Sequence, residues 1–315
     1  MAQAVGATSS YDVSVNREDL GNVIHMIDPT ETPIISAMGT NNASNTKHEW
    51  IVRSIRASAA NAHIEGDDAA PSTRSQASRL DNQCQILKEH AVVTGTQQKG
   101  MDHAGVKDKM AEEMSLAMAE VKLDLERAVA GVHNAKVVGN DTTAREMGSI
   151  QSYLTTNSDR GATATEPTGD GSDVPGSGTA RDFTETILES VLEDCYTNGA
   201  KPKIMYVSAT NKGVVADFTG GGTHYVDKDN KELINSVDVY IGSLGHTLKV
   251  VPSRELNSED VLLIDPEYIK LSNLRNVHSY DLAKQGDSFR KEIVWETTLE
   301  VCNEAAHAII GDTNG

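Results

Sequence analysis

The chain has 315 residues, 38% of them hydrophobic and only 4% aromatic, with 46 acidic against 28 basic residues and a formal net charge of -18. This length suits one large domain or two ordinary ones, and the lean hydrophobic content suggests that part of the chain is buried against other subunits. The acidity argues against a protein that grips nucleic acid through a positively charged groove.

Compartment signals in the sequence point to a protein made and kept in a reducing cytoplasm. No apolar run is long enough to span a membrane, and the first residues, MAQAVGATSSYDVSV, have neither the basic nor the apolar part of a secretory signal. Cys84, Cys195 and Cys302 lie far apart without a CxxC pair, which predicts reduced structural thiols rather than a disulfide framework.

The N-terminal part alternates between flexible and short ordered stretches. Residues 1–15 are small and polar and predict a flexible arm, and a short helix is expected at Arg17–Ile27. Pro29 and Pro33 then predict an extended turn before an apolar patch that begins at Ile34.

Two extended stretches follow, at Lys47–Ile55 and at Leu80–Thr96, with a loop rich in Ala, Ser and Asp at residues 57–79. Ile64 is the only large aliphatic residue of that loop, so the pair predicts a long two-stranded arm whose tip has no core of its own. Because a lone hairpin is marginal in water, such an arm must lie on something, and another copy of the chain is the simplest candidate. The alternative is a disordered surface loop.

A long amphipathic helix is predicted at Val106–Val132. Apolar residues recur there at spacings of three and four and form one stripe, made of Met110, Met114, Ala117, Val121, Leu125, Ala128 and Val132. A Gly-, Ser- and Thr-rich linker follows at residues 155–182.

Beyond the linker the pattern predicts a second α+β region. Asp182-Phe-Thr-Glu185 resembles a capping box before a helix with an inner stripe of Phe183, Ile187, Val191 and Cys195, ended by Asn198-Gly199. Short strands are expected at Ile204–Ser208, Thr247–Val251 and Val261–Ile264. Near the end, Ile293–Val301 alternates as a half-buried strand, with Ala305–Ile310 expected as its returning partner.

No catalytic, cofactor-binding or metal site is predicted, so we expect a protein that is not an enzyme. The glycines of residues 169–178 have no preceding strand and no Lys-Ser or Lys-Thr ending, as a nucleotide loop requires. Gly220-Gly221-Gly222 is not accompanied by a GxSxG elbow, and none of the ten histidines forms an HxxxH spacing.

Several segments together resemble one family, the tailed-bacteriophage major capsid proteins with the Hong Kong ninety-seven (Johnson) fold, in a branch formerly described as a domain of unknown function. The segments are PTETPIISAMG at 29–39, DLERAVAG at 124–131, AREMGSIQSYLTTN at 144–157, NGAKPKIMYVSATNKGVVADF at 198–218, LKVVPSRELNSEDVLLIDPEYIKLSNLRNV at 248–277 and EIVWETTLEVCNEAAHAIIGD at 292–312. They cover nearly the whole chain in the family's order.

The resemblance implies an α+β fold in five segments: an N-terminal arm (1–44), an extended β-hairpin loop (45–100), a peripheral domain with a spine helix (101–180), an axial domain (181–284) and C-terminal strands that return to the peripheral domain (285–315). It implies a shell of pentamers and hexamers around double-stranded DNA, assembled in the host bacterial cytoplasm. Scaffolding, portal and possibly decoration proteins are the further partners, with no cofactor, no membrane and no sequence-specific DNA binding.

Four residues of the extended loop are our candidates for contacts between subunits. Trp50 and Arg53 are expected at its base, and Arg74 and Arg79 as charge partners of a neighbouring subunit. Some members of the fold cross-link their shells through a lysine on this loop, but residues 57–79 contain none, so no such cross-link is expected. The alternatives are an encapsulin-type cellular compartment and, from another class, a soluble enzyme whose site is built from distant residues.

Overall fold

The structure is a computed structural model that describes residues 30–68, 74–100, 108–218, 226–227, 232–233 and 239–314. The flexible arm expected at 1–15, the helix expected at Arg17–Ile27 and the Gly220-Gly221-Gly222 run lie outside these residues. The described helices are α1 (Pro33–Ala37), α2 (Gly95–Gly100), α3 (Lys109–Glu126), α4 (Glu185–Asn198) and α5 (Ala209–Ala216). None of them combines the length and the apolar character that crossing a membrane requires.

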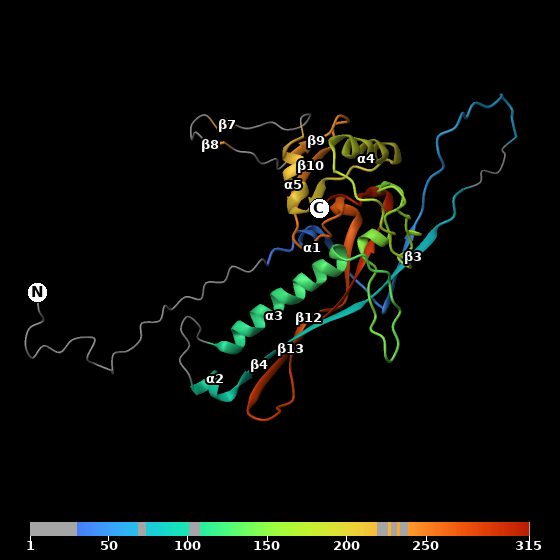
Figure 1. The fold of residues 1–315 in the computed structure, drawn as a ribbon. Helices are drawn as coiled ribbons and strands as arrows, with labels where there is room; N and C mark the ends of the chain where they lie inside the picture. The colour runs from blue at the N-terminus through green and yellow to red at the C-terminus, as the bar shows by residue number, and fades with distance from the viewer. Residues whose placement is uncertain are drawn as a thin grey trace, which may run out of the picture.

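A four-stranded sheet forms one half of the frame (Figure 1). Its order is β1 (Gly39–Asn42), β12 (Ile269–Asp281), β13 (Ser288–Val301) and β4 (Gln85–Thr94). β13 runs antiparallel to both β12 and β4, and β1 lies parallel to β12. The strand predicted from Ile293 to Val301 is therefore confirmed, and it begins five residues earlier, at Ser288. Its predicted half-burial is wrong, because Val294, Thr298 and Glu300 on the other face are buried too.

The long helix α3 lies along this sheet and buries the predicted stripe against it (Figure 1). Asp108 caps its start by accepting a hydrogen bond from Ala111 N, and Val121 and Leu125 pack with Leu299 of β13 in one hydrophobic core. The helix is confirmed as far as Glu126 and then widens into a π-helical turn, Arg127–Gly131. There Gly131 passes so close to the Glu255 carbonyl oxygen that a Cβ atom would lie 2.2 Å from it.

A six-stranded sheet forms the second half, in the order β5 (Ser158–Asp159), β14 (Ala308–Ile310), β11 (Val261–Ile264), β6 (Ile204–Val207), β10 (Thr247–Pro252) and β9 (Val239–Ile241). The three strands predicted in this region are confirmed as β6, β10 and β11. Side chains of α4 and α5 pack with the sheet in a second hydrophobic core, which joins Leu192 and Val215 to Met205 and Leu263.

The start of α4 differs from the prediction. Thr184, not Asp182, caps the helix by accepting a hydrogen bond from Ile187 N, and Asp182 instead accepts one from the Asn314 side chain. The buried stripe of the helix is Leu188, Val191, Leu192 and Cys195, whereas Ile187 is only partly buried. Phe183 is buried as predicted but lies before the helix starts. The predicted end is confirmed, with Gly199 in the left-handed conformation at φ 81°.

The predicted pairing of residues 305–310 with the preceding strand is wrong. β14 pairs with β11 and β5 in the six-stranded sheet, after a tight 3-10 turn at Glu304–Ala306. The physical reason is twofold: both edges of β13 are already occupied, and the three residues of β14 are all fully buried. A strand that is apolar on both faces belongs in the interior of a covered sheet.

The extended stretch predicted at Leu80–Thr96 is two strands rather than one. β3 (Ser78–Gln83) pairs with β2 (Lys47–Val52) as a hairpin, whereas β4 belongs to the four-stranded sheet. The break falls at the fully buried Cys84, whose N–H donates to Thr46 O at 2.8 Å. A further two-stranded ribbon pairs β7 (Val226–Asp227) with β8 (Glu232–Leu233).

Candidate functional site

The hairpin arm, residues 47–83, is the first candidate site, and Trp50 anchors its base. Trp50 lies opposite Leu80 in the hairpin and is only 8% exposed. Its ring centroid lies 5.9 Å from that of Tyr153, in the same core as α3 and the four-stranded sheet. Burial of this aromatic surface within its own subunit fixes where the arm leaves the body.

A buried carboxylate makes the second anchor of the arm. Glu300 of β13 accepts hydrogen bonds from Ser272 Oγ at 2.7 Å and Asn41 Nδ2 at 3.0 Å, and His48 Nε2 of β2 lies 2.9 Å from the same oxygen. Burial by itself would raise the pKa of Glu300, but the hydrogen bonds from His48, Ser272 and Asn41 outweigh it and lower that pKa to about 2. Ionised Glu300 therefore ties β2 of the arm to the four-stranded sheet and links the β1, β12 and β13 strands of that sheet.

Beyond Val52 the arm leaves the body of its own subunit (Figure 1). Its described residues, 53–68 and 74–77, belong to no strand, and all of them are exposed. Ile55 and Ile64 are 96% and 84% exposed, respectively. An extended segment with apolar side chains in water and no sheet to pair with gains almost nothing from its own fold. This part of the chain therefore gains little stability from its own subunit, and contact with another surface would add to it.

The four candidate residues of the arm differ in how far they are buried. Trp50 has little surface left for another subunit, whereas Arg53, Arg74 and Arg79 are exposed. Arg53 Nε donates to Ser75 O at 3.2 Å across the arm, and Arg79 pairs with Glu49 of its own hairpin at 3.2 Å. Arg74 has no hydrogen bond or ion pair with any described residue. The four residues thus lie along one arm without forming a cluster.

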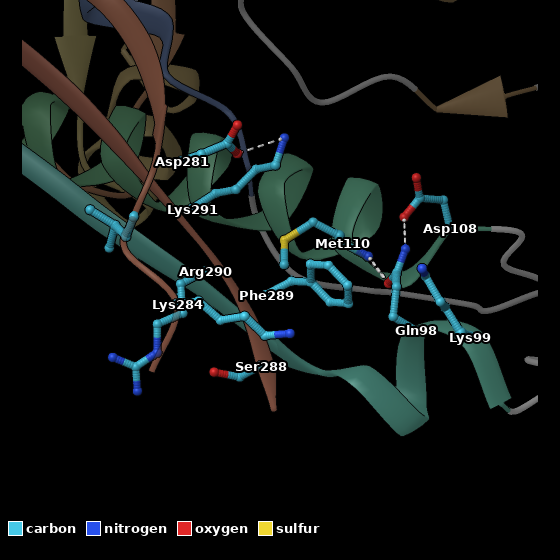
Figure 2. Close-up of a pocket in the computed structure, with 11 residues that line it drawn as sticks. Gln98, Lys99, Asp108, Met110, Asp281, Lys284, Ser288, Phe289, Arg290 and Lys291 are labelled. Carbon is cyan, nitrogen blue, oxygen red and sulfur yellow. Dashed lines mark hydrogen bonds and ion pairs between the residues drawn. The ribbon is translucent and has the colours of Figure 1, made fainter. Parts of the chain in front are cut away.

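A second candidate site lies at the opposite end of the four-stranded sheet and was not predicted from the sequence (Figures 1 and 2). A cavity of about 430 Å³ opens where α2, the start of α3 and the β12–β13 turn meet. The Phe289 ring lies in it beside Met110, with Lys99 Nζ and Lys284 Nζ each 5.8 Å from the ring centroid (Figure 2). We call this cavity the Phe289 pocket.

Burial in the interior of the protein shifts the pKa values of several titratable groups. Burial raises the pKa of the Cys84 thiol to about 11 and that of Cys195 to about 12, which keeps both protonated and poorly nucleophilic at neutral pH. Burial likewise lowers the pKa of His307 to about 4. Among the described residues, no group of three or more His, Cys, Asp and Glu side chains is placed to hold a metal ion.

Comparison with known proteins decides the family. A family model described as the SU10 major capsid protein matches residues 7–314. The chain belongs to this family of major capsid proteins. A curated relative of this capsid protein is the major capsid protein of Escherichia phage Phieco32, which is 22% identical over 337 residues, covering 96% of this chain and 95% of the relative.

Solved phage structures share the fold of this capsid protein along almost its whole length. The cyanophage A-1(L) capsid asymmetric unit matches with a TM-score of 0.65 at 13% identity, over 98% of this chain and 99% of that one. Mycobacterium phage Adephagia gives 0.62 at 12% identity, with the same two coverages. A structure of the major capsid and decoration proteins of phage G gives 0.56 at 10% identity, over 99% of each chain.

These findings confirm the resemblance that was inferred from the sequence. The fold is the α+β Hong Kong ninety-seven type, and the chain is a major capsid protein of a tailed phage, a structural part of the virion. In a shell subunit the working surfaces are those that meet other copies. The hairpin arm and the Phe289 pocket are therefore its candidate functional sites.

Proposed function

We propose that copies of this chain join into pentamers and hexamers, which close into an icosahedral shell around the double-stranded DNA of the phage. The observation that carries the proposal is the hairpin arm. It is anchored at its base by Trp50 and Glu300, yet residues 53–68 leave the body fully exposed. An arm held at one end and without a core at the other is suited to lie across a neighbouring subunit.

The rest of the chain is proposed to supply the peripheral and axial domains implied by the resemblance, although each sheet takes strands from more than one of the five segments. The four-stranded sheet with α3 serves as the peripheral domain, and the six-stranded sheet with α4 and α5 serves as the axial domain at the capsomer centre. Hydrogen bonding crosses these limits, because β12 of residues 181–284 pairs with β13, and β14 of residues 285–315 pairs with β11. The subunit thus works as one framework rather than as separable modules.

The chain's role is proposed to be purely structural, without enzymatic activity. The net charge of -18 fits a container whose wall does not grip the DNA inside. Assembly takes place in the host bacterial cytoplasm, with scaffolding and portal proteins as partners and decoration proteins on the outside. Arg74 and Arg79 act as charge partners of the neighbouring subunit, and Arg53 contacts it at the base of the arm. Alanine at both Arg74 and Arg79 is expected to impair assembly.

The test is negative-stain electron microscopy with light scattering on the purified chain, alone and co-expressed with its phage partners. Closed shells, or rings of five and six subunits, are expected from the wild type. A variant in which residues 53–77 are replaced by a short Gly-Ser turn keeps Trp50 and Glu300 and is expected to remain a folded, free subunit. Wild-type chains that stay monomeric beside their partners would refute the proposal, as would shells formed without the arm.

A further inference from the structure

The Phe289 pocket carries positive charge that its own subunit does not neutralise. Lys291 is paired with Asp281 at 3.3 Å, and Asp108 is engaged as the cap of α3, where the Gln98 side chain also donates to it at 2.7 Å. This leaves Lys99 and Lys284, and neither forms an ion pair within the described part of the chain. Both ammonium groups instead lie beside the face of Phe289, a weak attraction that leaves them free to bind an anion.

Arg290 and Asp287 complete the charges around the pocket. Arg290 donates to Gln285 Oε1 at 2.5 Å and makes no ion pair with a described carboxylate. Asp287 lies beside Gly95 and lines an adjoining cavity together with Lys99 and Lys284, but it forms an ion pair with neither lysine. The wall is also apolar, since Phe289 is 38% and Leu282 36% exposed. The pocket thus fits a ligand that combines carboxylates with one apolar side chain.

The apex of the hairpin arm, Ile64–Asp68, has the complementary chemistry. Asp67 N donates to Ile64 O at 3.1 Å, and Gly66 takes φ +85° in the turn, so the apex presents Glu65, Asp67 and Asp68 close together. All five residues are exposed, including the apolar Ile64. Residues 57–68 contain no lysine or arginine, and the one histidine, His63, already pairs with Asp67 at 3.1 Å.

The pocket and the apex lie at opposite ends of one subunit. Figure 1 shows the arm leaving the body beyond β3, whereas α2 and the β12–β13 turn lie at the far end of the sheet. An arm therefore cannot reach the pocket of its own subunit. Two complementary patches at opposite ends of one chain produce a head-to-tail contact, which generates a ring when the rotation closes.

We propose that the Phe289 pocket receives the arm apex of a second copy of this chain, with Glu65 and Asp68 against Lys99 and Lys284 and with Ile64 against Phe289. This inference rests on the proposed shell function and specifies the partner of its arm. It makes the contact polar and salt-sensitive, with one apolar anchor at its centre.

A charge-swap series tests the contact in the full-length chain with its phage partners. The pocket variant is Lys99→Glu with Lys284→Glu, and the arm variant is Glu65→Lys with Asp68→Lys. Each is expected to lower the yield of shells by about tenfold or more, because it sets like charges against each other. Combining all four substitutions is expected to bring the yield back to within about threefold of wild type, since the attraction is rebuilt with its sign reversed.

Two controls distinguish the loss of the proposed contact from an effect of net charge and from misfolding of the variants. The arm variant is combined with Lys201→Glu and Lys249→Glu, two exposed lysines outside the pocket, which gives the same net charge as the four-fold swap. This combination is expected not to restore assembly. Urea unfolding of each free subunit shows which variants fold as stably as the wild type, and only those enter the comparison.

Three results would overturn the inference while the shell function stands: wild-type yield from the pocket or arm variant, no restoration by the four-fold swap between folded subunits, or equal restoration by the charge control. A wild-type chain that forms no shell with its partners would instead refute the proposed function itself. Restoration by the four-fold swap alone supports the pocket–apex contact.

Discussion

Replacing Glu300 by glutamine is expected to loosen the base of the hairpin arm. The pKa of Glu300 falls from 4.5 to about 2 in the fold, and each pKa unit corresponds to about 1.4 kcal/mol, so the ionised side chain contributes about 3 kcal/mol to stability. A glutamine at this position cannot be ionised. Its carbonyl oxygen can take the place of the oxygen that His48, Ser272 and Asn41 contact, but the hydrogen bonds that it accepts are no longer strengthened by a negative charge. We therefore expect Glu300→Gln to lower the unfolding free energy by about 3 kcal/mol at pH 7.

The dependence on pH gives this prediction a definite sign. Because the folded pKa of Glu300 lies below the unfolded value, the contribution is present above pH 4.5 and is lost as the pH falls towards 2. Urea unfolding of the free subunit should be followed by tryptophan fluorescence. The chain has only two tryptophans, Trp50 and Trp295, and both lie in strands next to the site.

The control for this measurement is Glu120→Gln, at an exposed carboxylate of α3, which is expected to change the unfolding free energy by about 0.5 kcal/mol or less. The gap between wild type and Glu300→Gln should be widest at neutral pH and should narrow in acid. A gap that is absent at pH 7, or that widens as the pH falls, would show that Glu300 does not anchor the arm in this way.

Three further predictions concern other parts of the molecule. Glu126→Ala removes the carboxylate that accepts hydrogen bonds from Ile34 N and Ile35 N and should cost about 2–4 kcal/mol in urea unfolding, because two amides lose their acceptor. Gly131→Ala should cost about 1–3 kcal/mol and lower the Tm, because its Cβ would press on the Glu255 carbonyl oxygen; an unchanged Tm would contradict the close approach. Shells boiled in denaturant should run as single subunits on a gel rather than as a covalent ladder, because residues 57–79 contain no lysine.

Elements with a clean period could be predicted from the sequence, and those without one could not. The apolar stripe predicted α3 because one face of it is buried against the sheet. β12 was missed because its second half is exposed on both faces and because the register shifts between Asn273 and His278, so no alternation survives. α1 was missed because five residues are too few to show a helical period.

Of the two candidate sites, the arm could be predicted from the sequence and the Phe289 pocket could not. The arm was predicted from its composition. The sequence indicates that Trp50 is buried, but it does not tell whether the surface that buries this side chain belongs to its own subunit or to another. The Phe289 pocket brings α2 and the start of α3 together with the β12–β13 turn, which lies far from both in the chain. Only the pairing of β4 with β13 places Lys99 next to Phe289. No local pattern contains that information.

The strand order of the four-stranded sheet also affects how fast each newly made subunit folds. β4 must wait for β13, with Thr94 opposite Ser288, and β1 must wait for β12, with Gly39 opposite Lys270. The chain loses conformational entropy in closing these long loops before the strand pairing can stabilise it, and this slows folding. Unpaired strand edges remain exposed during that time. A phage needs many copies of this chain within one infection, so folding of the subunit competes with aggregation before assembly begins. Changes that slow the pairing of β4 with β13 will lower the supply of shells even when every contact between subunits is intact.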